Sequence, residues 1–239
     1  MTTSATKAAP VLKAQLAEEQ LQAIRQFDVC TISNAIETFG VRLANEGFAD
    51  ASIRCLVPGG RPMLGYAAIG RIRASSVPMT GRRLCDRVGW WEYLLTTPAP
   101  RVVVVQDVSD TPGLGAFVGE IHATILMRLG CVGAVTNGAV RDLPAVEAMG
   151  FGLFAGNVAV SHCFARLADF GEPVEVGGLK VQPGDLIYGD RHGVLSIPKQ
   201  IAPDIPAVAA RLVAQERRII DLCRSPDFSI EKLRAAVSE

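Results

Sequence analysis

The feature that most constrains the fold is a β-branched run over residues 101–105, Arg101 followed by four valines, which ends at Gln106 and Asp107. Such a continuous apolar run is typical of a strand buried on both faces, as in a parallel sheet covered by helices. A loop at residues 109–115 follows, and Gly130 ends the next apolar segment. We therefore expect a helix over about residues 118–129, a strand over 131–136, a short helix over 143–149 and a strand over 152–155.

Other patterns flank these β–α units. Residues 16–27 have helical apolar spacing, and Thr31 or Ser33 is expected to cap a second helix that stops at Gly40. The C-terminal part from about residue 201 is predicted to be helical, with a break at Ser225. Further elements are expected at 67–77 (strand), 84–95 (helix), 174–181 (hairpin), 186–188 and 194–197 (strands). The sequence thus predicts an α/β fold: one mixed domain over residues 16–239 with flanking N- and C-terminal helices, preceded by a flexible tail over residues 1–15.

The charge balance excludes several classes of protein. The 24 basic and 24 acidic side chains give a formal net charge of zero, which leaves no electrostatic footprint for nucleic acid or a membrane surface. No apolar run reaches the ~18 residues that a membrane span needs, and the Ala/Thr/Lys-rich start lacks a signal-peptide core. The six cysteines form no C-x-x-C pair, so we expect buried, reduced thiols in a cytoplasmic protein.

A pair of charged residues follows the second predicted strand. The apolar run that begins at residue 133 ends in Asn137 and Gly138, which together are a turn signal, and Arg141 and Asp142 come next. Pro144 suits the first turn of a helix, so Asp142 is a candidate cap for that helix. The alternative is that the arginine and the aspartate bind an anionic substrate and a cation together. The spacing alone leaves both interpretations open.

Another acidic residue, Glu120, precedes Arg141 and Asp142 by about twenty positions. Gly119 lies where a loop enters a helix, so the backbone amides of Glu120, Ile121 and His122 are expected to point outward without partners. A helix start of this kind binds carboxylates well.

Together, the two segments have the parts of a metal and 2-oxo acid site. Arg141 can grip a carboxylate with two hydrogen bonds. Asp142 and Glu120 can supply hard oxygen ligands to Mg²⁺ or Mn²⁺, directly or through water. The pattern favours chemistry in which a 2-oxo acid chelates a divalent metal and its enolate is stabilised. A surface ion pair beside a helix-capping glutamate is the competing interpretation.

Three other groups of residues could carry chemistry. Asp107 and Asp110 follow the strongest strand, and they either line a site or cap a loop. His122, His162 and His192 share no metal-ligand spacing, so structural roles are favoured. All five lysines lie in tails, turns or helical flanks, which argues against a Schiff-base enzyme.

The order and spacing of several motifs also resemble those of a known protein family. Gly119-Glu120 precedes Gly138-Ala139-Val140-Arg141-Asp142, and a later series follows: Asp169-Phe170-Gly171-Glu172-Pro173-Val174, Gly177-Gly178, Val181-x-Pro183-Gly184-Asp185 and Gly189-Asp190-Arg191-His192-Gly193-Val194. In these motifs the chain resembles the 4-hydroxy-4-methyl-2-oxoglutarate aldolase and RraA-like family (regulators of ribonuclease E activity). The resemblance covers about residues 29–199.

The resemblance implies a swivelling β/β/α sandwich that assembles as trimers or dimers of trimers, with clefts at subunit interfaces. By position, Asp142 would match the metal ligand, Arg141 the substrate-binding arginine, and Glu120 an acid that reaches the metal through water. The amides after Gly119 would match the pocket for the pyruvyl carboxylate. The implied reaction is retro-aldol cleavage to pyruvate, or decarboxylation of oxaloacetate, with Mg²⁺ or Mn²⁺.

Two departures from the family pattern narrow this prediction. Aldolase members usually carry another acid at the position of Ala145, whereas here the first is Glu147, and the glycine-rich segment before Gly119 is short. Both departures weaken the prediction of this particular substrate more than the prediction of metal-enolate chemistry. The leading hypothesis is therefore a metal-dependent lyase that acts on a 2-oxo acid.

Two alternatives stay open. One is a non-catalytic regulator that binds a protein partner. The other is a related lyase or hydratase for a larger apolar substrate, suggested by Trp90 and Trp91. For the distal group of a substrate, the candidate contacts are Arg71, His162 and Arg191.

Overall fold

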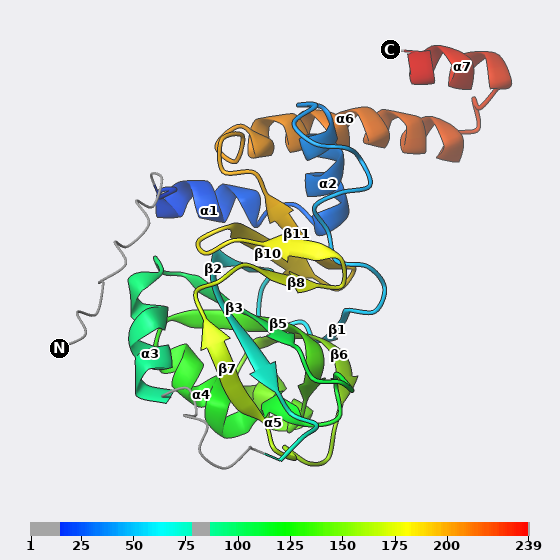
Figure 1. The fold of residues 1–239 in the computed structure, drawn as a ribbon. Helices are drawn as coiled ribbons and strands as arrows, with labels where there is room; N and C mark the ends of the chain where they lie inside the picture. The colour runs from blue at the N-terminus through cyan, green and yellow to red at the C-terminus, as the bar shows by residue number, and fades with distance from the viewer. Residues whose placement is uncertain (1–14, 78–86, 239) are drawn as a thin grey trace.

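A mixed sheet forms the centre of the molecule in the computed structural model, which describes residues 15–77 and 87–238. Within these ranges the sheet has nine strands (Figure 1): β1 (Arg54–Val57), β2 (Met63–Arg73), β3 (Arg101–Asp107), β4 (Ala116–Val118), β5 (Cys131–Val140), β6 (Gly152–Val158), β7 (Arg166–Phe170), β10 (Leu186–Asp190) and β11 (Gly193–Ile197). Neighbours follow the order β1-β6-β5-β3-β2-β10-β11, with β4 also on β5 and β7 on β2. The central pairs β2–β3, β3–β5 and β5–β6 are parallel.

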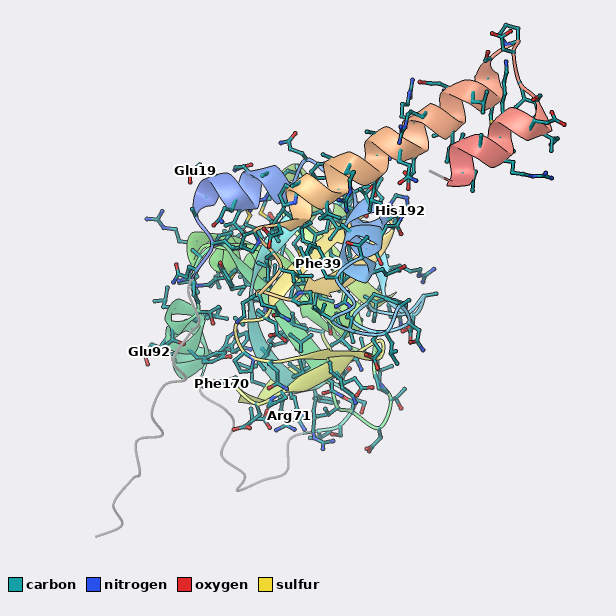
Figure 2. The ribbon with its side chains drawn as sticks, turned by 90° about the horizontal axis from the view of Figure 1, so that it is seen from above. Glu19, Phe39, Arg71, Glu92, Phe170 and His192 are labelled. Atoms are coloured by element: carbon teal, nitrogen blue, oxygen red, sulfur yellow. The ribbon has the colours of Figure 1, made fainter. Side chains whose placement is uncertain are left out.

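The helices cover two parts of this sheet. The helices of the described residues are α1 (Glu18–Ile24), α2 (Val29–Glu37), α3 (Arg87–Thr96), α4 (Glu120–Arg128), α5 (Leu143–Ala148), α6 (Ile205–Arg224) and α7 (Ile230–Ser238), and all but α7 contribute to this cover. In Figure 1, α3, α4 and α5 lie together on the lower part, whereas α1, α2 and the start of α6 lie over β10 and β11. The rest of α6 extends past the body in Figures 1 and 2, and α7 folds back beside it.

Three apolar clusters hold these layers together. One joins the sheet to α3, α4 and α5 and includes Trp90 and Leu126. A second lies between the sheet and α1, α2 and α6 and includes Ile32 and Tyr188. The third lies under the separate hairpin β8 (Val174–Val176) and β9 (Leu179–Val181) and includes Phe154. The expected mixed α/β domain with flanking helices is confirmed.

The main error of the sequence prediction concerns strand β5. A turn was expected at Asn137 and Gly138, but both residues lie inside the strand, which continues to Val140. The Asn137 side chain accepts a hydrogen bond from the Asp107 amide (2.6 Å) and donates one to the Asp107 carbonyl (3.1 Å). These bonds tie β5 to the end of β3 where the register of β5 shifts against β6. Tertiary pairing therefore overrides the local turn signal.

Smaller differences concern element ends. Helix α2 is capped by Asp28, whose carboxylate accepts from the Thr31 amide at 2.7 Å, and not by Thr31 or Ser33. Strands β1, β4 and β7 were not expected, because they are short and lack alternation. Residues 1–14 of the predicted tail (1–15) and residues 84–86 of the predicted helix (84–95) lie outside the described residues.

The cysteines differ in part from the expectation of buried thiols. Cys30, Cys55, Cys131, Cys163 and Cys223 are all free, but only Cys131 of these five is buried. Burial raises the pKa of the Cys131 thiol to about 12. None of the helices in the described residues is long and apolar enough to cross a membrane.

Candidate active site

The two sequence segments that carry the candidate residues meet where β4 pairs with β5. Val118 is in register with Val140, and the Arg141 amide donates to the Val118 carbonyl at 3.0 Å. Gly119 and Arg141 therefore leave the sheet side by side. Helix α4 starts directly after Gly119, and Asp142 directly precedes α5.

The backbone at Gly119 makes room for the arginine and the aspartate. Its φ of −141° is open to any residue, so the need for glycine is steric. A Cβ atom there would lie 2.6 Å from Asp142 Oδ2 and 2.9 Å from Arg141 Cγ. Only a residue without a side chain allows both groups to approach the start of α4 this closely.

Asp142 caps a helix, but not the one that follows it in sequence. It has a left-handed backbone (φ 58°, ψ 35°) and makes no side-chain cap bond to α5. Its Oδ2 instead accepts a hydrogen bond from the Glu120 amide at 3.1 Å. A carboxylate at a helix N-terminus is stabilised by the positive end of the helix dipole, so Asp142 caps α4.

This contact corrects part of the sequence prediction. The amide of Glu120 was expected to point outward unpaired, but it donates to Asp142. The first intrahelical bond of α4 runs from Ala123 to the Gly119 carbonyl, so the amides of Ile121 and His122 lie before it, in the turn that has no intrahelical acceptors. Neither amide has a partner among the described residues, so both can bind a ligand. The Glu120 side chain is exposed on the helix.

Arg141 and Asp142 also interact with each other. Arg141 Nε lies 3.5 Å from Asp142 Oδ2, and the two side chains are 35% and 40% exposed. An ion pair with this exposure adds little stability. The pair is better suited to binding, because both charged side chains are partly exposed and line a pocket.

Both side chains line a pocket of about 350 Å³. The predicted residues Gly119, Ile121 and His122 line it too, and so does His162. The Glu120 side chain, by contrast, is not part of the described lining. The other lining residues are Arg87, Trp90, Trp91, Ala116, Phe117, Ile125, Ala165, Arg166 and Leu167. The structure thus brings most of the predicted site residues together.

One wall of the pocket is aromatic and apolar. Trp90 is buried, and its indole Nε1 has no hydrogen-bond partner among the described residues. The rings of Phe117 and His122 meet edge to face, with their centres 4.7 Å apart. The wall can hold an apolar part of a ligand beside the charged pair.

His122 is held in one orientation. Its Nδ1 lies 3.0 Å from the Phe117 carbonyl oxygen, and a carbonyl can only accept, so Nδ1 carries the proton. Burial lowers the pKa of His122, and the nearby Arg87 guanidinium acts in the same direction. The ring is therefore neutral at pH 7 and keeps Nε2 as an acceptor.

Sequence reasoning missed two cations of the pocket. Arg87 begins α3, and Arg166 begins β7, a strand that was not expected. Arg166 donates to the carbonyls of Ser76 (2.6 Å) and Phe164 (3.1 Å). No sequence signal set these two apart from the many other arginines, since each belongs to the pocket only through the sheet order.

Two residues predicted to contact the distal part of a substrate lie elsewhere. Arg71 Nε is paired with Asp169 Oδ1 at 2.7 Å on the sheet. Arg191 lies in the turn between β10 and β11. Neither lines the described pocket.

The aspartates after β3 divide into one structural and one exposed residue. Asp107 is buried, and its carboxylate accepts from the amides of Ser109 (3.0 Å) and Gly113 (2.9 Å) and from the Ser109 hydroxyl. It therefore holds the 108–115 loop in place. Asp110 is exposed in that loop. The loop-capping interpretation is thus correct for Asp107.

The donor set suits a weakly held divalent cation. The part of the chain that the structure describes has no cluster of three or more histidine, cysteine, aspartate or glutamate side chains able to hold a metal. Mg²⁺, however, usually binds proteins through one or two carboxylates and keeps several waters or substrate oxygens. The half-exposed carboxylate of Asp142 fits that mode, and Glu120, whose amide donates to Asp142, lies beside it in the first turn of α4.

Comparison with known proteins identifies the family. The profile of the RraA-like family, "Aldolase/RraA", matches residues 29–196, and the chain belongs to this family. It is 35% identical over 137 residues to a protein of Halalkalibacterium halodurans named "Putative 4-hydroxy-4-methyl-2-oxoglutarate aldolase". That alignment covers 55% of this chain and 64% of the relative, which is less than two thirds of its length.

Solved structures share the fold over nearly the whole chain. An uncharacterized protein from Pseudomonas syringae pv. tomato superposes with a TM-score of 0.71 at 22% identity, over 96% of this chain and 99% of the other. Streptomyces coelicolor RraAS2, an unusual member of the RNase ES inhibitor RraA protein family, gives a TM-score of 0.66 at 20% identity, over 86% and 97%. These likenesses confirm the predicted RraA-like fold.

Proposed function

We propose that this protein is a lyase that cleaves a carbon–carbon bond of a 2-oxo acid with the help of Mg²⁺ or Mn²⁺. One observation carries the proposal: Arg141 and Asp142 line one pocket together with the N-terminal turn of α4. A guanidinium, a carboxylate and free helix amides are what a chelating 2-oxo acid and its cation require. The name of the Halalkalibacterium relative supports the same class of reaction.

Each residue has a defined task in this proposal. Arg141 binds the carboxylate or the 2-oxo oxygen with its two-pronged fork. The amides of Ile121 and His122 bind the remaining carboxylate oxygen at the positive end of α4. Asp142 directly, and Glu120 through a water, would hold the divalent cation. When bound, that cation supplies Lewis-acid charge to the 2-oxo group.

The reaction on a 4-hydroxy-2-oxo acid then follows. The bond between C3 and C4 breaks as the 4-hydroxyl group loses its proton and becomes a carbonyl. The electron pair passes to the 2-oxo oxygen, which gives the enolate of pyruvate, and a proton added at C3 completes pyruvate. For oxaloacetate the fragment that leaves is carbon dioxide. We assign Glu120 to orient the water that carries the proton.

The test is pyruvate release from oxaloacetate and from 4-hydroxy-2-oxo acids in the presence of Mg²⁺ or Mn²⁺. Asp142→Asn is the sharpest variant, because asparagine tolerates the left-handed backbone as well as aspartate does but lacks the charge. We expect a loss of kcat/KM of about 100-fold or more, and a comparable loss in EDTA. Asp110→Asn, in the exposed loop, is the matched control. Full activity of Asp142→Asn, or full activity in chelator, contradicts the proposal.

The aromatic wall supports a second candidate within the same class. Trp90, Trp91 and Phe117 favour a substrate whose part beyond C4 is apolar or aromatic, such as a 4-aryl-4-hydroxy-2-oxo acid. A substrate panel decides: we expect Trp91→Ala to raise KM for an aryl substrate about tenfold or more and to leave the KM for oxaloacetate within about twofold. Equal effects on both substrates contradict this assignment.

A non-catalytic regulator is the alternative class of function. It predicts no ligand in the pocket, whereas the lyase predicts that Mg²⁺ with oxalate, a mimic of the pyruvate enolate, raises the melting temperature. We also expect the catalytic unit to be a trimer or a dimer of trimers with sites at its subunit interfaces, which sedimentation equilibrium measures.

A further inference from the structure

The C-terminal arm, defined as residues 213–237, spans the end of α6 and α7 and is not covered by the rest of the described chain. The start of α6 packs on α2 through buried Ile205 and Ala209. Beyond Ala209, none of the described side chains is buried. Figures 1 and 2 both show the second half of α6 extending past the body, with α7 beside it.

The arm nevertheless carries many apolar side chains. Ile219 and Leu222 on α6, and Leu233 on α7, are half-buried, and the two helices contact each other. Five large apolar side chains are left between 40% and 60% exposed: Val213, Ile220, Phe228, Ile230 and Val237. A nine-residue helix such as α7 is marginal in water without an apolar partner surface.

The exposed face of α6 is complementary to itself. Val213, Glu216, Arg217 and Ile220 follow i, i+3, i+4, i+7 spacing and so share one face of the helix. A two-fold axis that passes between Glu216 and Arg217 of two antiparallel copies would set Val213 against Ile220 of the second copy. The same axis would set Glu216 against Arg217 of the second copy.

We propose that the arm is a dimerisation element, which pairs with the arm of a second copy of this chain to form an antiparallel four-helix bundle. A two-fold contact uses the same patch on both subunits, so the patch must be complementary to itself. This face is, because Glu216 would meet Arg217 of the second copy. Two paired helical hairpins would enclose the apolar faces of both helices, as in a four-helix bundle. Acidic and basic residues are interspersed along the arm, so a lipid or nucleic-acid surface fits it less well.

The existing ion pair on α6 is compatible with this contact. Arg217 Nε lies 3.1 Å from Asp221 Oδ1, and both side chains are mostly exposed. Such an exposed pair within one helix contributes little. Arg217 can therefore turn toward a glutamate of a second copy at small cost.

The experiment compares the mass of the full-length protein and its variants by sedimentation and light scattering. We expect Ile220→Asp to halve the number of chains in the particle and to leave the melting profile of the body unchanged. Leu43→Asp, an exposed apolar residue of the body, is the matched control and should keep the wild-type mass. Pairing of the arms does not depend on the lyase activity, and the particle mass measures it without any substrate.

A charge exchange tests the register. Glu216→Arg alone places arginine against Arg217 of the second copy, and we expect the dissociation constant of the pair to rise about tenfold or more. Adding Arg217→Glu restores opposite charges across the axis and should return the wild-type mass. A wild-type particle with an odd number of chains, an unchanged mass of Ile220→Asp, or a double variant as weak as Glu216→Arg each overturns the proposal.

Discussion

Replacement of Gly119 by alanine tests whether the site depends on the close approach of Asp142 to α4. The new Cβ would lie 2.6 Å from Asp142 Oδ2, and ordinary contact begins at 3.4 Å, so the carboxylate must retreat by about 0.8 Å. Arg141 Cγ, at 2.9 Å, must move as well. Both side chains are partly exposed and can therefore swing away without disturbing the core.

The effect should fall on catalysis much more than on stability. A misplacement near 1 Å costs about 100-fold in rate, so kcat/KM for pyruvate release should fall about 10- to 100-fold. The lost cap between Asp142 and the Glu120 amide costs about 1 kcal/mol. For a chain of this length that lowers Tm by about 2–4 °C.

The assay is pyruvate formation coupled to lactate dehydrogenase, with Tm from circular dichroism on the same samples. Gly60→Ala is the control, because Gly60 has an ordinary backbone and a Cβ atom there would meet no other heavy atom within 4 Å. A kcat/KM for Gly119→Ala within about twofold of the wild type would refute the geometric argument. So would a fall in Tm above about 10 °C, since Gly119 would then act through the fold.

Three further predictions concern stability and reactivity. Asp107→Ala leaves the amides of Ser109 and Gly113 without their acceptor, so it should lower the free energy of unfolding by about 1–3 kcal/mol in a urea titration. The pKa of His122 is lowered from 6.5 by burial, so the unfolded state takes up the proton first and stability should fall as the pH drops below 6.5. His122→Asn should remove that part of the pH dependence, and an unchanged slope would contradict the assignment. Cys131, with its pKa raised to about 12, should resist alkylation of the folded protein at about pH 8 while exposed Cys223 reacts, as peptide mass mapping would show.

The fold could be predicted where burial alone fixes the local structure. Strand β3 and the first part of β5 are apolar runs that require cover on both faces, and both were predicted. The β8–β9 hairpin follows from Gly177 and Gly178, which both have positive φ. The end of β5 was mispredicted, because Asn137 bonds to the backbone of β3, a partner thirty residues away. Local turn statistics contain no information about such a partner.

In the site, too, some features could be predicted from local sequence and others depend on tertiary contacts. Its central pair and Gly119 could be recognised from residue type and order. The left-handed backbone of Asp142, which turns its carboxylate onto α4 instead of α5, depends on the β4–β5 pairing. Arg87 and Arg166 reach the pocket from elements far apart in the sequence, so only the sheet order reveals them.

The pairing of Val118 with Val140 has a consequence for how this protein can vary. The two halves of the site are joined by the ladder of β4 and β5 and by the bond from Arg141 to Val118, while residues 108–115 only connect β3 to β4. Insertions or deletions within that connection should therefore leave the chemistry intact. A single residue added to 116–118 or 137–140 would rotate one half against the other. Loop length is thus free to diverge among relatives, whereas the spacing from each strand to its functional residue is fixed.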